Sequence, residues 1–159
     1  MQPNNMRAIR ILLALAVGSL GLACAGPVPD SLGVQAAGAG LAPCPASPNC
    51  VTSGAADAVH SVAAFRIAGD VADGWSKIRE AVQATTRTEV VTYSDRYLHA
   101  ESTSLWMRYV DDLELLLDPA TGRVDVRSAS RVGYGDMGVN AARVQALRTQ
   151  LIGSGVLAP

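Results

Sequence analysis

Residues suited to chemistry are concentrated between positions 127 and 143, where the sequence reads RSASRVGYGDMGVNAAR. The glycines in this stretch imply tight turns or a close approach of the backbone to another group. Arg143 falls in the first turn of a predicted helix, where a positive charge is unfavourable unless an anionic group lies nearby. Asp136 could supply that charge, and so could a bound carboxylate or phosphate. The glycine spacing fits neither the dinucleotide-binding fingerprint nor a phosphate-binding P-loop.

Acidic residues on a preceding segment complete a candidate polar or anion-binding site. Its members are Asp111, Asp112, Glu114, Arg127, Ser128, Ser130, Arg131, Asp136, Asn140 and Arg143. The interpretation that we favour is a structural network in which carboxylates neutralise guanidinium groups, namely Asp111, Asp112 and Asp136 against Arg108, Arg131 and Arg143. The alternatives are a site for an anion or a lipid headgroup, and a hydrolase or transferase that uses the 127–143 loop and the nearby acidic residues.

Other catalytic patterns are weaker. Strand alternation places Asp111 on one face of its strand and the later acidic residues on the other, so these carboxylates do not converge on a metal ion. His99 shares a face with Tyr97 and Glu101, which is more typical of a polar sheet face than of a ligand set. No serine lies in a G-x-S-x-G elbow. We therefore assign no catalytic residue, no metal and no cofactor, and an enzyme is not the favoured class.

The elements that must position these residues follow from periodicity and turn signals. Strand candidates cover 62–67, 89–93, 97–104, 106–117 and 123–132, and helix candidates cover 70–84 and 141–152, capped by Asp70 and Asn140. The order is β-α-β-β-β-β-α. Consecutive strands with short turns form an antiparallel sheet, and two helices cover only one of its faces. We predict an α+β fold, a single domain in which a curved antiparallel sheet packs on two helices.

One hairpin allows the strand register to be predicted. If Pro119 to Gly122 form its loop, Leu117 pairs with Val124 on the core side. The same register places Glu114 opposite Arg127 on the other face. That opposite-charge pair was not used to choose the register, so it supports it.

The N-terminus has the features of an export signal. Arg7 and Arg10 precede residues 11–23, which carry no charge and are too few to span a bilayer. Two cleavage patterns compete. Leu20 to Cys24 resembles a bacterial lipobox, which would make Cys24 the lipidated first residue, whereas Ala23-Cys24-Ala25 resembles an A-x-A site that would release a soluble protein beginning at Gly26. Three cysteines leave an odd thiol in an exported protein, which favours lipidation of Cys24.

Residues 24–43 are rich in Gly, Pro and Ala and are predicted to be a flexible tether between the signal peptide, 1–23, and the domain, 44–159. At the start of that domain Cys44 and Cys50 enclose two prolines. Export places both thiols in an oxidising compartment, so we predict a structural disulfide between them. Their spacing is longer than that of a redox pair, and no further Cys or His stands close enough to complete a zinc set.

Charge and composition restrict the partners. Thirteen basic residues against fourteen acidic ones give a net charge of −1, which excludes a nucleic-acid partner held by counterion release. The expected partner is a membrane surface, reached through an acylated Cys24. The expected location is the periplasmic side of the cell envelope, as an anchored lipoprotein or a soluble periplasmic protein. The function expected there is that of a non-catalytic binding or structural module.

Four ordered motifs resemble a known family. They are CPASPNCV from Cys44, YLHAE from Tyr97, YVDDLE from Tyr109, and the run from Arg127 to Arg143. Together they are similar to the domain of unknown function family 1499, over about residues 41–152. The resemblance implies a small exported or membrane-associated domain and supplies no substrate.

Overall fold

The computed structural model describes residues 25–35 and 40–159. The predicted signal peptide and Cys24 lie outside the described residues. Eight elements follow in order: β1 (Cys50–Thr52), β2 (Phe65–Arg66), α1 (Val71–Gln83), β3 (Thr88–Tyr93), β4 (Tyr97–Thr103), β5 (Val110–Asp118), β6 (Arg123–Ser130) and α2 (Val139–Gly153). Within the described ranges, no helix has the length and apolar character needed to cross a membrane.

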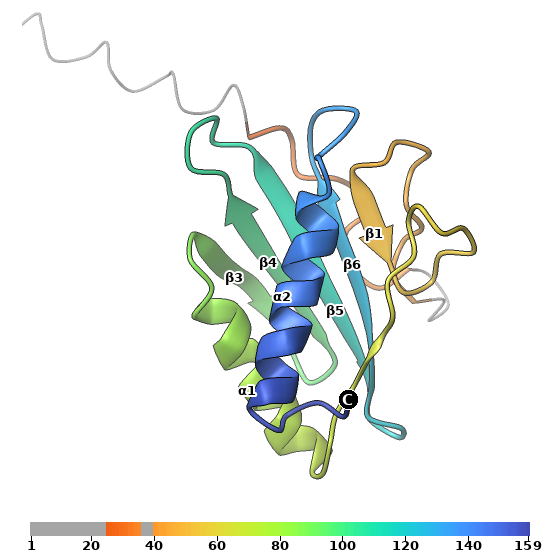
Figure 1. Ribbon diagram of the computed structural model, residues 1–159, viewed down its shortest axis with the longest axis vertical. Coiled ribbons are helices and arrows are strands. Elements are labelled where there is room, and N and C mark those ends of the chain that lie inside the picture. Colours follow the sequence, from red (N-terminus) through yellow and green to blue (C-terminus); the bar gives the residue numbers. More distant parts are fainter. Residues whose placement is uncertain (1–24, 36–39) are drawn as a thin grey trace, which may run out of the picture.

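The strands form one open antiparallel sheet. Its order is β1-β6-β5-β4-β3, and β2 also pairs with β6. Both helices lie on the same face of this sheet, as Figure 1 shows. The predicted α+β fold, with one antiparallel sheet packed on two helices, is therefore confirmed.

The hydrophobic core lies between the helices and the sheet. Trp75, Ile78 and Val82 form the buried stripe of α1, and Asp70 caps this helix by accepting a hydrogen bond from the N–H of Asp73, 2.8 Å away. The buried residues of α2 include Val144, Leu147 and Leu151. Helical spacing of three to four residues puts each set on one side of its helix, so both helices can bury an apolar face against the same sheet.

The predicted register of the β5–β6 hairpin is confirmed. Leu117 pairs with Val124 and Glu114 pairs with Arg127. Leu117 and Val124 belong to the core, whereas Glu114 and Arg127 point to the face that the helices do not cover. Alternation along two strands thus separates an apolar face from a charged one.

The region before β5 differs from the prediction. Residues 106–109 are not part of the strand, because the N–H of Ser104 bonds to the carbonyl of Tyr109 and closes a turn. Arg108 occupies the left-handed region within that turn, with φ 58°. The pattern of apolar residues that predicted a strand from Trp106 belongs instead to an exposed loop.

Two further differences concern the edge strand and the second helix. β1 was not predicted, since its three residues carry too little periodicity to be distinguished from a loop. Asn140 is not the cap of α2, which begins after Gly138. Gly138 is the N-cap residue, and the Asp136 carboxylate before it accepts hydrogen bonds from the N–H groups of Gly138 and Asn140.

The described parts of the predicted tether contact the sheet. The N–H of Gly33 donates to Glu114 Oε1 at 2.8 Å. Gly26 packs so closely on the chain after β6 that a methyl group added to it would lie 2.8 Å from Val132 Cγ1. Residues 25–35 therefore lie along the face that the helices leave open, an arrangement that composition did not predict.

Candidate functional site

The face of the sheet opposite the helices carries a layer of charged and polar side chains. Tyr97, His99 and Glu101 alternate along β4, Asp112 and Glu114 along β5, and Arg127 and Arg131 along β6 and the residue after it. We call these seven residues the charged face. Glu114 has no exposed surface and Asp112 is 1% exposed. Charges buried to this degree require partners within the protein.

Glu114 is the centre of the first group of contacts. Its Oε2 accepts from Arg127 Nη1 at 2.8 Å, and its Oε1 accepts from the Tyr97 hydroxyl and the Gly33 N–H, each also at 2.8 Å. Burial and the neighbouring Glu114 charge raise the pKa of Tyr97 above its ordinary value. Tyr97 therefore stays a neutral hydroxyl that donates a hydrogen bond to Glu114.

Asp112 is the centre of the second group. It accepts from His99 Nε2 at 2.7 Å, and from Arg131 at 2.9 Å through Nε and 2.7 Å through Nη2. Arg131 also bonds to Glu101. Burial opposes ionisation of Asp112, but the hydrogen bonds from His99 and Arg131 outweigh it and hold the pKa of Asp112 below its ordinary value. The hydrogen bond to Asp112 raises the pKa of Arg131, so this pair remains ionised.

A second polar cluster lies on the helix side of the sheet. Asn140 is fully buried, and its side chain accepts from the Ser128 hydroxyl and donates to the Asn49 carbonyl and to Ser130 Oγ. Arg143 donates to Asp111 Oδ2 at 2.6 Å. The anionic group expected beside Arg143 is thus Asp111, whereas the Asp136 carboxylate bonds to N–H groups at the start of α2.

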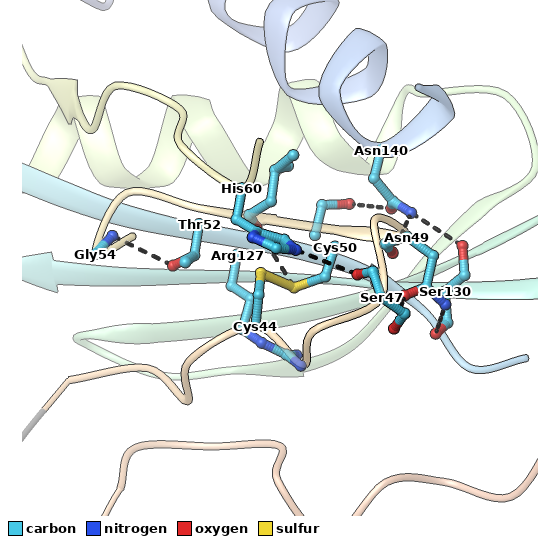
Figure 2. The surroundings of a disulfide bond; sticks show 12 residues. Cys44, Ser47, Asn49, Cys50, Thr52, Gly54, His60, Arg127, Ser130 and Asn140 are labelled. Atoms are coloured by element: carbon cyan, nitrogen blue, oxygen red, sulfur yellow. Dashed lines mark hydrogen bonds between the residues drawn. A yellow bond between two sulfur atoms is a disulfide. The ribbon is translucent and has the colours of Figure 1, made fainter. Parts of the chain in front are cut away.

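The predicted disulfide between Cys44 and Cys50 is confirmed, with the two sulfur atoms 2.06 Å apart. Figure 2 shows its surroundings, in which Asn49 and Asn140 link the disulfide turn to α2 and the Arg127 side chain extends past the cysteines. Asn49 adds a hydrogen bond of 2.7 Å to the Gly133 carbonyl. A disulfide indicates an oxidising and hence exported location.

A pocket of about 530 Å³ lies between residues 25–35, the disulfide turn and β6. Its wall includes Pro29, Cys44, Arg127 and Arg131. Arg127 Nε is buried and has no hydrogen-bond partner among the described residues. The charged face as a whole nevertheless has three carboxylates for two guanidinium groups, a balance that does not favour capture of an anion.

The charged face also contains three potential metal ligands. One ligand atom from each of His99, Glu101 and Asp112 lies within 4.8 Å of the others. Arg131 bonds to both of these carboxylates and supplies the positive charge that a metal ion would supply. A cation could bind there only after Arg131 moved away.

The structure divides the sequence-predicted site between two faces. Asp111, Ser128, Ser130, Asn140 and Arg143 meet on the helix side, and Asp112, Glu114, Arg127 and Arg131 meet on the charged face. Within the favoured structural network, Asp112 pairs with Arg131 and Asp111 with Arg143, although Asp136 was the internal partner suggested for Arg143. Among the described residues, neither Asp136 nor Arg108 forms an ion pair. Alternation had placed His99, Tyr97 and Glu101 together without assigning them to the site. The contact from Gly33 was missed, because no local pattern connects positions so far apart in the chain.

The structure is an α+β domain with a disulfide and a layer of buried ion pairs. A family model described as a protein of unknown function, DUF1499, matches residues 40–151. The chain therefore belongs to the DUF1499 family, as its motifs indicated. No curated protein and no solved structure matches the chain.

Proposed function

We propose that this protein is an envelope lipoprotein, anchored through Cys24, whose folded domain is a non-catalytic binding or structural module on the periplasmic side. The observation that carries the proposal is the mutual pairing of the groups that could perform chemistry. Arg127 pairs with Glu114 and Arg131 with Asp112, and all four side chains are buried. Groups that must stay paired to remain buried are poorly suited to exchange protons with a substrate.

The disulfide and the N-terminal pattern support the location. The Cys44–Cys50 bridge requires an oxidising compartment, and the uncharged run at 11–23 leads directly to Cys24. With two of the three cysteines joined to each other, Cys24 is the one left for an acyl chain.

Labelling of the full chain with palmitate in a bacterial host tests the anchor. The wild-type protein should incorporate the label and the Cys24→Ala variant should not. A wild-type protein that is exported without label would mean release by ordinary signal peptidase and would overturn the lipoprotein assignment.

A screen for ester and phosphate hydrolysis tests the non-catalytic assignment. We expect no turnover above that of a variant with Arg131→Met and Asp112→Leu, in which the central ion pair is replaced by apolar groups. Turnover by the wild type that this variant loses, while it still folds, would instead support the hydrolase alternative.

A further inference from the structure

Two loops at one end of the sheet expose large apolar side chains. One joins β4 to β5 and the other joins β6 to α2, and both lie at the same end of the molecule in Figure 1. Trp106 is 87% exposed, Tyr134 78% and Met137 100%. We call the exposed apolar side chains of these loops the apolar tip: Leu105, Trp106, Met107, Tyr109, Tyr134 and Met137. A gathering of exposed apolar side chains marks a surface that meets another apolar phase.

The two loops form one surface. A groove of about 490 Å³ between them is lined by Leu105, Trp106 and Met107 from the first loop and by Val132 and Met137 from the second. Both loops also contain a residue other than glycine in the left-handed region, Arg108 at φ 58° and Met137 at φ 55°. This conformation is disfavoured for such residues. Met137 is thus fully exposed and also has an unfavourable backbone conformation.

The course of the chain indicates what the tip meets. Gly26 packs against Arg131 and Val132 at the base of the second loop. The described chain begins at the end of the molecule where both loops lie (Figure 1). Cys24 precedes Gly26 by two residues, which span at most about 7 Å. An anchor at Cys24 would therefore hold the apolar tip against the membrane surface.

The chemistry of the tip fits a bilayer interface. Trp and Tyr are the side chains that concentrate at the level of the lipid headgroups. The first loop has an exposed cation, Arg108, and no acidic residue between 104 and 109. The acidic residue of the second loop, Asp136, is occupied by the N–H groups of Gly138 and Asn140. The tip therefore presents apolar surface with one exposed cation and one carboxylate whose charge backbone N–H groups stabilise, so its contact with a membrane rests on the apolar side chains.

We infer that the apolar tip inserts into the headgroup region of the phospholipid bilayer to which the chain is anchored. The inference rests on the proposed lipoprotein function and adds the surface through which the domain contacts the membrane. Insertion fixes the orientation of the domain. The β4–β5 and β6–α2 loops face the lipid, and the β5–β6 turn is directed away from it. A second copy of the chain and a protein partner are the competing occupants.

Tryptophan fluorescence of the full chain tests this inference, because the sequence has two Trp in opposite environments. Trp75 is buried in the core and Trp106 is exposed at the tip. The full chain is reconstituted with vesicles of phosphatidylcholine and phosphatidylglycerol, with and without bromine on the upper part of the acyl chains. Trp106→Phe serves as the matched control, since it removes only the exposed indole and leaves the core unchanged.

We expect brominated lipid to quench Trp106 about twofold, because an inserted interfacial side chain lies within the headgroup and upper acyl region. The emission that remains in Trp106→Phe, which comes from Trp75, should not change. Aqueous iodide should quench Trp106 in the absence of vesicles and lose this effect when vesicles are added.

The remaining outcomes distinguish failure of the insertion inference from failure of the proposed lipoprotein function. Flotation with vesicles without excess quenching of the wild type would overturn insertion and leave the anchor intact. If the wild type takes up no palmitate, lipidation is refuted. Excess quenching in a Cys24→Ala chain would then still support insertion. Protection of Trp106 from iodide without vesicles would overturn the inference, and dependence on protein concentration would identify a second copy as the occupant. Failure of the wild type to float would also overturn insertion.

Discussion

Individual side chains on the charged face are held in pairs that cannot be broken one at a time without cost. Glu114 has no exposed surface, and it depends on Arg127, Tyr97 and the Gly33 N–H for stabilisation of its charge. Removing one partner from a buried pair leaves an uncompensated charge, which costs more than the pair itself contributes.

Arg127→Ala should lower the free energy of unfolding by about 3 kcal/mol, because it leaves Glu114 buried without its counter-ion. Urea denaturation measures the change. Arg123→Ala is the matched control, since Arg123 lies on the same strand and its pair with Asp125 is exposed. The control should change stability by less than about 1 kcal/mol.

The combination of Glu114→Arg with Arg127→Glu should recover part of the loss, because it restores opposite charges at the same register position. An Arg127→Ala protein as stable as the wild type would contradict the structural role of this pair.

Asp112 makes stability depend on pH in a defined direction. Its pKa in the folded protein is below the ordinary value of 3.8. The stabilisation that it provides is therefore fully present well above that value and is lost as the pH falls through the lower, folded pKa. Between about pH 6 and pH 3, the free energy of unfolding should fall less in Asp112→Asn than in the wild type.

Denaturation at each pH measures this slope. Asp125→Asn is the control, since Asp125 forms an exposed pair. Asp136 also has a lowered pKa, so some slope should persist in Asp112→Asn. Equal slopes in Asp112→Asn and the wild type would contradict the buried contacts of Asp112.

At the scale of the elements, β1 depends on contacts outside its own sequence. It has three residues, and it is held by pairing with β6, by the disulfide at Cys50 and by Asn140, which donates to the Asn49 carbonyl. A strand this short has little stability of its own, so these long-range contacts determine that it forms.

Replacing both cysteines, Cys44→Ala with Cys50→Ala, should lower the free energy of unfolding by about 2 kcal/mol, the chain-entropy value for so small a ring. Thermal melts under non-reducing conditions measure the loss. Mass analysis of the wild type should first show a chain lighter by two hydrogen atoms than its reduced form. Two free thiols in the folded wild type would contradict the bridge.

Asn140 joins α2 to β6 and to the residue before β1. Asn140→Ala should cost about 2 kcal/mol, because it leaves the buried Ser128 hydroxyl and Asn49 carbonyl without this partner. Gln145→Ala on the exposed side of the same helix should change stability by less than about 0.5 kcal/mol. Chemical denaturation of both variants provides the comparison, and equal effects would contradict the role of Asn140.

The whole molecule has an asymmetric arrangement. The helices cover one face of the sheet, residues 25–35 lie on the other, and the apolar tip extends from one end (Figure 1). The chain enters the domain beside that tip, so tethering and docking would act at the same end. A short connection raises the effective concentration of a weakly binding surface at its target.

Substitution of the tip should separate stability from membrane contact. Trp106→Ser combined with Met137→Ser should change the free energy of unfolding by less than about 0.5 kcal/mol, because both side chains are exposed. Adding Tyr109→Trp to this double variant places a fluorescent indole at the tip. Iodide should quench that indole to the same extent with and without vesicles, because the substituted tip no longer inserts. Thermal melts and quenching measure the two effects. A large loss of stability would show that the tip packs within the domain.

The sequence by itself determined the features that depend on local periodicity. Alternation from Leu113 to Leu117 separated the apolar face from the charged one, and the turn at 119–122 set Glu114 opposite Arg127. The spacing of Trp75, Ile78 and Val82 predicted the buried side of α1. The cysteine count and the prolines between Cys44 and Cys50 predicted the disulfide. Side-chain periods of 2.0 and 3.6 residues make such features visible within a few positions.

Only the tertiary structure decided which distant segments meet. It brought Gly33 to Glu114 and Asn140 to Asn49, made Asp111 the partner of Arg143, and left Trp106 exposed in a loop. The same residue types would have been compatible with other pairings, because a carboxylate can satisfy any nearby guanidinium or N–H group. The choice between those partners depends on how the sheet, the helices and the N-terminal segment pack together, and no local pattern in the sequence contains that information.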